Sequence, residues 1–230
     1  MQIVKPSFKI ELTKEQAEQM ILNVEKYGRI CYKSEPVKVD NPVERANKFI
    51  ADKIKAGHES IIEHEKVTAI ITCDRGVTHE IVRHRIASYS QESTRYCNYA
   101  KDKFGNEITV IDIATGFNYN LNDENDKKKY DVWCEAMENA EKSYFKMLEL
   151  GAKPQEARSV LPNSTKAEIV VTMNLRSWRH FFALRAAGVT GAPHPQMKEI
   201  ALPMLKEFYN LFPCVFEDIV SKLDITGSFN

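Results

Sequence analysis

Residues 67–96 read VTAIITCDRGVTHEIVRHRIASYSQESTRY, and this stretch organises the fold we expect. Its first seven residues are apolar and rich in β-branched side chains, which predicts a buried strand. Asp74 is a suitable N-cap for a short helix, and Arg83 and His84 would occupy its last turn. The serine-rich residues 86–96 have no helical stripe and are predicted to form a loop. Rigid elements would therefore hold the loop in place, as a binding site requires.

The same stretch concentrates fixed cations beside hydroxyl groups. Four arginines (Arg75, Arg83, Arg85 and Arg95) accompany three serines. Guanidinium groups match the geometry of phosphate oxygens and stay charged at physiological pH. They predict a site for an anionic, phosphorylated small molecule. The alternative is a solvated helix end whose charges pair with one another, because runs of charge usually face water.

The composition limits the classes of protein that fit. The chain has 230 residues, 43% of them hydrophobic, which is enough for one domain with a sizeable core. Its 32 basic and 32 acidic residues balance, which argues against nucleic-acid and membrane partners. Five widely spaced cysteines and no signal peptide predict a reduced, cytoplasmic protein.

One segment invites a metal interpretation. Residues 57–66 read GHESIIEHEK and hold His58, His64 and several glutamates. The spacing differs from the H-E-x-x-H of helical zinc sites, and no third ligand is evident. We therefore expect no metal site. For His64 the alternative to a ligand role is a structural one, in which it caps a helix or pairs with a glutamate.

The remaining periodicity predicts an α+β fold, a single domain over residues 1–230. Thr13 and Gln16 form a capping box for the first helix, and Gly28 is expected to end it. Apolar periodicity predicts a long helix over residues 123–150 and a final helix that is interrupted at Pro203. Segments rich in β-branched residues are expected to form one central β-sheet flanked by helices: 67–73, 107–113 and 167–173.

A family resemblance rests on motifs at separate places. RHRIASYSQESTRY (83–96) resembles the signature of the flavin-dependent thymidylate synthases, an R-H-R triplet followed by a serine and an arginine. ARSVLP (157–162) matches the family's A-R-x-x-L-P. NLRS (174–177) matches N-x-R-S and is followed by a second L-R pair, and GHES (57–60) matches a segment that lines the flavin pocket.

The resemblance implies reductive methylation of dUMP to dTMP. In this family, 5,10-methylenetetrahydrofolate donates the carbon, reduced FAD supplies the hydride, and NADPH reduces the flavin again. The resemblance also implies a homotetramer with its sites at subunit interfaces. The expected partners are therefore dUMP, folate, NADPH and further copies of the chain.

The resemblance also assigns ligand roles. Arg185 is expected to lie against the uracil ring and favour its ionised form, which makes it the catalytic residue. The full set expected to bind dUMP is Glu80, Arg83, Gln91, Glu92, Ser93, Thr94, Arg95, Arg158 and Arg185. The set expected to bind FAD is His58, Ser60, Arg83, His84, Arg85, Gln91, Asn174, Arg176, His180 and His194. Some relatives carry glutamine at the position of Glu80, so this carboxylate should point away from phosphate or pair with an arginine.

Other interpretations remain open from the residues alone. Ser93 would need a base to act as a nucleophile, and its own loop offers only Glu92, so a ligand role is predicted. A cysteine nucleophile has little support, since only Cys97 lies near the arginines. The alternative for Arg158 is a side chain that packs its stem on an apolar face and pairs with a carboxylate. The rival classes are an RNA-binding module with stacking tyrosines and a structural oligomer with self-paired charges.

Overall fold

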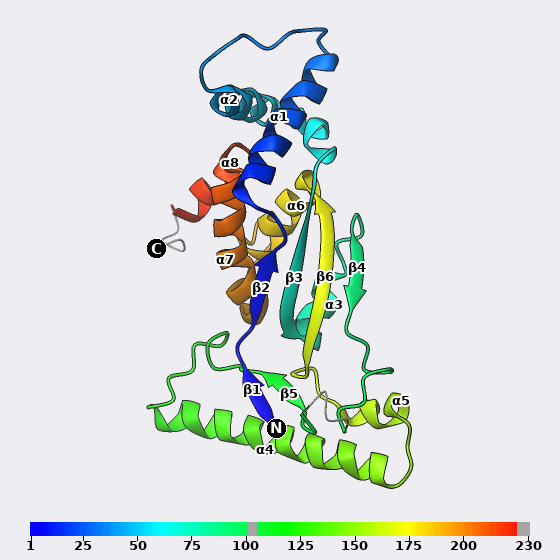
Figure 1. Ribbon diagram of the computed structural model, residues 1–230. Coiled ribbons are helices and arrows are strands. Elements are labelled where there is room, and N and C mark those ends of the chain that lie inside the picture. The colour runs from blue at the N-terminus through cyan, green and yellow to red at the C-terminus, as the bar shows by residue number, and fades with distance from the viewer. Residues whose placement is uncertain (101–104, 225–230) are drawn as a thin grey trace. The chain divides into compact units, whose positions relative to one another are not determined.

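The computed structural model describes residues 1–100 and 105–224 and has a mixed α/β fold (Figure 1). The strands are β1 (Gln2–Val4), β2 (Ser7–Ile10), β3 (Lys66–Asp74), β4 (Ser88–Gln91), β5 (Thr109–Ile111) and β6 (Lys166–Asn174). The α-helices are α1 (Lys14–Ile30), α2 (Pro42–Lys55), α3 (Arg75–Ile81), α4 (Glu124–Glu149), α5 (Pro154–Ala157), α6 (Leu175–Arg185), α7 (Pro195–Leu211) and α8 (Pro213–Asp224). Short 3-10 helices are η1 (Glu59–Glu63) and η3 (Arg158–Val160).

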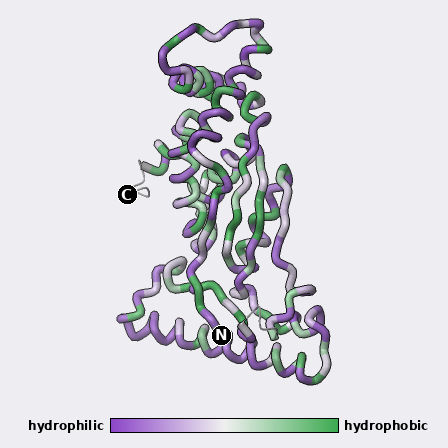
Figure 2. Tube along the Cα trace, in the orientation of Figure 1, coloured by the Kyte–Doolittle hydropathy of each residue, from purple (hydrophilic) through white to green (hydrophobic). Residues whose placement is uncertain are grey.

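The strands form two sheets. A four-stranded sheet has the order β2-β3-β6-β4, and β1 pairs with β5 in parallel. Hydrophobic residues recur along β3 and β6, where burial alternates along each strand (Figure 2). This alternation follows from the two-residue repeat of a strand, which sends successive side chains to opposite faces.

The chain separates into two compact units, and β3 and β6 contribute residues to both. The first unit contains Met1–Phe8, Ile70–Arg83 and Tyr89–Val170. In its core Met137 and Tyr144 of α4 pack with Ile108 and Val110. Glu141 of the same helix accepts a hydrogen bond from the Ile108 amide at 2.9 Å, which joins α4 to the β1–β5 pair (Figure 1).

The second unit contains residues 9–69, 84–88 and the described residues from 171 onward. An aromatic cluster fills its core: Trp178 and Phe182 of α6 pack on Phe208 of α7, Phe181 packs against Trp178, and Phe182 also contacts Phe216 of α8. Trp178 donates its indole N–H to the Val67 carbonyl at 3.1 Å, which ties α6 to β3. The prediction of one domain over residues 1–230 stays a prediction.

Local signals placed most helix starts correctly. The predicted capping box of Thr13 and Gln16 is confirmed, as is the Asp74 cap, whose carboxylate accepts from the Val77 amide at 2.7 Å. Within residues 1–100 and 105–224, no helix has the length and apolar character needed to cross a membrane.

Several predictions of detail were wrong. The strand predicted at 107–113 pairs with β1 in a separate sheet instead of joining β3 and β6. The predicted loop at 86–96 contains β4, which adds an edge to the larger sheet. The helix expected to carry Arg83 and His84 ends at Ile81, because the Arg83 amide turns back to the Glu80 carbonyl at 3.2 Å.

Two helices also differ from their predicted bounds. α1 continues past Gly28 to Ile30. Gly28 is buried where a Cβ atom would meet the Phe49 ring at 2.9 Å, so this glycine allows close packing and does not end the helix. α7 passes through Pro203 without interruption. Its buried Met204, Leu205 and Phe208 show why: packing of the apolar face outweighs the hydrogen bond that proline removes.

Candidate functional site

The R-H-R triplet lies just beyond the end of α3. Arg83 and Arg85 are exposed, whereas His84 between them is buried, with 8% of its surface accessible. Arg83 belongs to the first unit, and His84 and Arg85 belong to the second. The two guanidinium groups are thus presented to solvent, while the imidazole is part of the packing of its unit.

His84 contacts the last residue of α6. The Nε of Arg185 donates a hydrogen bond to Nε2 of His84 at 3.2 Å. The His84 ring also meets the edges of His180 and Phe181, with ring centroids 5.6 and 5.0 Å away. Arg185 and His180 were both predicted from the sequence as ligands, so the second unit brings three predicted site residues together.

The electrostatics of this cluster keep His84 neutral. Burial lowers the pKa of His84 to about 4, and the charge of Arg185 and the electrostatic influence of His180 act in the same direction. A neutral imidazole that accepts at Nε2 carries its proton on Nδ1. Near pH 7, His84 therefore accepts a hydrogen bond from Arg185, and as a neutral ring it does not repel the guanidinium.

Two arginines of α6 pair with acidic residues of η1 and α8. Arg176, half exposed, lies 2.5 Å from Glu63 and 3.4 Å from Glu59. Arg179 is buried and forms a bidentate pair with Asp218 at 2.7 and 3.0 Å, a third contact with Glu59 at 3.2 Å, and a bond to the Val215 carbonyl. Arg176 thus keeps an exposed face for a ligand, whereas Arg179 is committed to the fold.

The other residues of the predicted flavin set in this unit lie at element ends. His58 precedes η1, Ser60 lies within it, and both are exposed. Asn174 is the N-cap of α6, with its side-chain oxygen accepting from the Ser177 amide at 2.8 Å. His194 is the exposed residue before α7.

In the first unit, β4 and the turn after it position the acidic and amide groups. Gln91 donates to the Thr78 hydroxyl of α3 at 3.0 Å. Glu92 accepts from the Lys166 ammonium at 3.1 Å and from the Tyr99 hydroxyl at 3.2 Å. Burial, with the charge of Glu92 adding to it, raises the pKa of Tyr99, so this phenol remains a donor. Both carboxylate oxygens of Glu92 thus already accept a hydrogen bond, and the ligand role of Ser93 stays a prediction.

The remaining residues of the predicted nucleotide set differ in exposure. Thr94 is buried, and Ser93 is half-buried and accepts from the Arg95 amide at 3.3 Å. The Arg95 guanidinium is exposed and lies 5.2 Å from the centre of the Tyr96 ring. Arg158 is exposed at the start of η3, and Glu80 is half-buried within α3.

Two further candidate residues belong to neither predicted ligand set. Nη1 of Arg75 and Nε2 of Gln196 are buried and have no hydrogen-bond partner among the described residues. A buried donor without a partner is costly, so each is a group that a ligand would satisfy. Arg75 lies inside the arginine-rich stretch, which is a usable signal. Gln196 lies in the first turn of α7, and no pattern in the sequence marks it.

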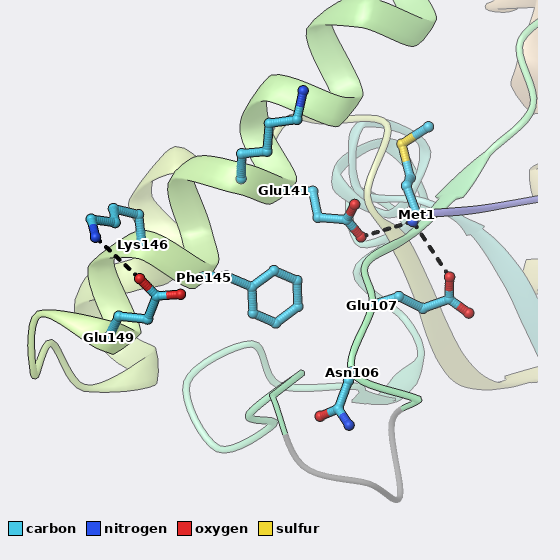
Figure 3. Close-up of a pocket in the computed structure, with 8 residues that line it drawn as sticks. Met1, Asn106, Glu107, Glu141, Phe145, Lys146 and Glu149 are labelled. Carbon is cyan, nitrogen blue, oxygen red and sulfur yellow. Dashed lines mark hydrogen bonds and ion pairs between the residues drawn. The ribbon is translucent and has the colours of Figure 1, made fainter.

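The first unit has surface hollows that the predicted site residues do not line. One of about 390 Å³ is lined by Met1, Glu107, Glu141, Phe145 and neighbouring residues (Figure 3). The Met1 amine lies 3.4 Å from Glu107 and 3.0 Å from Glu141, so its charge is already compensated. None of the predicted site residues lines this hollow. Among residues 1–100 and 105–224, no three His, Cys, Asp or Glu side chains cluster as metal ligands would.

Comparison with known proteins identifies the family. A family model described as thymidylate synthase complementing protein matches residues 13–214. The flavin-dependent thymidylate synthase of Geobacter sulfurreducens is 32% identical over 197 residues, covering 83% of this chain and 78% of that protein. That of Pyrococcus abyssi is 37% identical over 152 residues, covering 66% of this chain, which spans 57% of the length of that relative.

A solved structure supports the fold. The UMP/dUMP methylase PolB from Streptomyces cacaoi, bound with 5-Br dUMP, superposes with a TM-score of 0.75 at 21% identity, covering 96% of this chain and 97% of that one. At this identity the likeness concerns the fold. With the family model matching most of its length, the chain belongs to the thymidylate synthase complementing protein family, the family of the flavin-dependent thymidylate synthases.

Proposed function

We propose that this chain is a methyltransferase that converts dUMP to dTMP, with 5,10-methylenetetrahydrofolate as carbon donor and NADPH as the final reductant. The names of its relatives support the flavin dependence and the product. The observation on which the proposal depends most is the Arg185–His84 pair, in which a neutral, buried imidazole holds a half-buried guanidinium by its Nε.

That pair suits the ionisation of a uracil ring. Because the guanidinium is planar, the hydrogen bond from Nε of Arg185 to His84 also restricts the directions in which the Nη donors point. Donors that are held in place beforehand stabilise negative charge as it develops, because they need no reorganisation during the reaction. Arg185 would thus favour the ring anion that attacks the carbon donor, and His84 would keep the guanidinium in position without adding charge.

The second unit fits a flavin nucleotide. Exposed Arg85 and half-exposed Arg176 offer charge for phosphate oxygens, and exposed His58, Ser60 and His180 offer further polar contacts. Nε2 of Gln196 is a buried donor whose partner a ligand would supply. FAD, when bound, supplies the hydride that reduces the transferred carbon. The chain's own groups bind and orient it.

The first unit would hold most of the nucleotide contacts. Exposed Arg83, Arg95 and Arg158 carry the charge that a phosphate monoester needs. Ser93 and Gln91 add hydrogen-bonding groups on and just after β4. Glu92 is held by Lys166, which limits the repulsion between its carboxylate and a bound phosphate.

We also propose the homotetramer, with sites at subunit interfaces. Large apolar side chains lie exposed directly after proposed ligands: Ile86, which follows Arg85, is 76% exposed, and Tyr96, which follows Arg95, is 77% exposed. Contact with further copies of the chain would remove this apolar surface from water. Cytoplasmic location is part of the proposal and is supported by five cysteines that are all free thiols.

A visible spectrum of the purified protein tests the flavin part of the proposal. We expect absorbance typical of an oxidised flavin, and release of FAD on denaturation. A colourless protein that neither binds added FAD nor makes dTMP, and that instead retards single-stranded RNA, would support the nucleic-acid-binding rival. Light scattering on the same sample tests the tetramer separately.

A further inference from the structure

His58 is held in place through both its backbone and its side chain. The His58 amide donates to the Lys53 carbonyl at 2.8 Å, which fixes the chain at the end of α2. Its Nδ1 lies 2.7 Å from the Tyr32 hydroxyl, a hydrogen-bond distance. The imidazole is nevertheless exposed, so its outer edge can reach a ligand.

Tyr32 is itself held by its surroundings. The Lys53 ammonium lies 3.9 Å from the centre of the Tyr32 ring, a cation–π contact, and 5.3 Å from the centre of the Phe49 ring. The same lysine therefore positions His58 through its carbonyl and Tyr32 through its ammonium. The arrangement defines a triad of Lys53, Tyr32 and His58.

A buried ion-pair network fixes the segment that carries Tyr32. Glu25, with 2% of its surface accessible, accepts from Arg29 at 2.8 and 2.9 Å and from Arg45 at 2.8 to 3.2 Å. Arg29 reaches on to the Glu35 carbonyl, and Arg45 reaches the Val37 carbonyl at 2.8 Å. These contacts clamp the chain after α1, so the Tyr32 hydroxyl has a defined position.

From this geometry we propose that Tyr32 is a positioning residue that holds the His58 imidazole toward the flavin. The proposal rests on the proposed function, in which His58 contacts FAD. A phenolic O–H donates to a neutral imidazole nitrogen, which places the ring proton on Nε2. His58 then offers an N–H to an acceptor on the ligand, such as a carbonyl oxygen. Fixing ring and tautomer before binding reduces the entropy that binding costs.

A double-mutant cycle on the full-length protein tests this role. Tyr32→Phe removes only the hydroxyl and keeps the ring beneath Lys53. We expect it to weaken FAD binding about fivefold, the effect of one hydrogen bond. His58→Ala should weaken binding by at least as much. In the His58→Ala background, Tyr32→Phe should have no further effect, because the hydroxyl acts only through His58.

Tyr27 provides a matched control. It lies beside His64 in the same unit, with ring centroids 5.5 Å apart in an edge contact. Tyr27→Phe removes a hydroxyl from a tyrosine next to a histidine that has no proposed role, so FAD affinity should not change. Nitrogen NMR of the neutral His58 ring gives a readout independent of the flavin: the Nε2–H tautomer should be nearly exclusive in the wild type, and its share should fall toward that of a free histidine in Tyr32→Phe.

The outcomes separate this inference from the proposed function. Wild-type protein that fails to bind FAD would refute both. FAD binding that His58→Ala does not weaken would overturn the inference and remove His58 from the flavin set, while leaving the proposed reaction in place. A Tyr32→Phe effect that is absent, or that persists in full in His58→Ala, would show that Tyr32 does not act through His58.

Discussion

Nε of Arg185 donates to Nε2 of His84 at 3.2 Å, which joins the end of α6 to the R-H-R triplet. The two residues are 101 positions apart in the chain, and each belongs to a different motif of the family resemblance. The contact assigns His84 a role beyond the flavin contact predicted from the sequence. It makes the histidine the support of the residue proposed to ionise uracil.

Arg185→Lys should lower the rate of dTMP formation while leaving the fold intact. Lysine keeps the charge but lacks the Nε–H that His84 accepts and the rigid fork of donors. We expect kcat to fall about 100-fold, the scale of a lost donor that stabilises developing charge. Chromatographic measurement of dTMP checks this, with circular dichroism as the control for folding. A rate within about twofold of the wild type would refute the role of Arg185.

His84 should make the stability of the protein depend on pH. Its folded-state pKa of about 4 lies below the ordinary value of 6.5, so the unfolded chain binds more protons between these pH values. The contribution of His84 to the unfolding free energy is therefore fully present above about pH 6.5 and is lost as the pH decreases toward 4.

This dependence can be measured against a variant that does not titrate. Between pH 7.5 and pH 5 the wild type should lose about 2 kcal/mol more unfolding free energy than His84→Phe, as urea unfolding at the two pH values would show. Equal losses would contradict the burial and charge argument for His84. His180→Gln should retain most of the wild-type dependence, since His180 is exposed and is only one of three causes of the shift.

Neighbouring arginines of α6 should separate stability from ligand binding. Arg179→Met leaves Glu59 and Asp218 without their buried partner and should lower the unfolding free energy by about 2–3 kcal/mol. This is less than for a fully buried pair, because Asp218 is half exposed. Arg176→Met removes an exposed pair and should cost about 0–1 kcal/mol.

For flavin binding, the order of the two variants should be the opposite of their order for stability. Arg176→Met is expected to weaken FAD binding about tenfold, because it removes a charge proposed to contact the ligand. Arg179→Met should leave the affinity of the folded protein near that of the wild type. Thermal melts and FAD titrations of both variants test the distinction, and a stable Arg179→Met protein that has lost FAD would contradict it.

Arg158→Ala should weaken dUMP binding about tenfold and reduce its sensitivity to salt, because one phosphate contact is lost. Lys153→Ala is the matched control: it removes an exposed cation nearby that has no proposed role. Calorimetric titration with dUMP at two salt concentrations distinguishes the variants. Equal affinities for Arg158→Ala and Lys153→Ala would remove Arg158 from the nucleotide set.

Local sequence signals predicted the elements that local contacts determine. Thr13 with Gln16 and Asp74 cap helices through hydrogen bonds to residues three positions away, as their local patterns predicted. β4 escaped prediction because its pattern S-Y-S-Q lacks β-branched residues and depends on a neighbour, β6, that lies far along the chain.

The candidate site shows the same difference between residues that local motifs predict and contacts that join distant parts of the chain. Motifs pointed to Arg176 and Arg185 as candidate ligands, but they could not show that Arg179, one turn from Arg176, is committed to Asp218, 39 positions away. Nor could they show that Tyr32 reaches His58 across 26 positions. Such pairs are determined by how helices pack, which the order of residues within each helix does not reveal.

The most direct test of the proposed reaction is tritium release from dUMP labelled at carbon 5 of the uracil ring. Methylation replaces the hydrogen on that carbon, so label should appear in water as dTMP forms. We predict release from wild-type protein that depends on FAD, NADPH and methylenetetrahydrofolate together, and little release from Arg185→Lys. Protein that binds FAD and dUMP yet releases no tritium with all three present would contradict the proposed function.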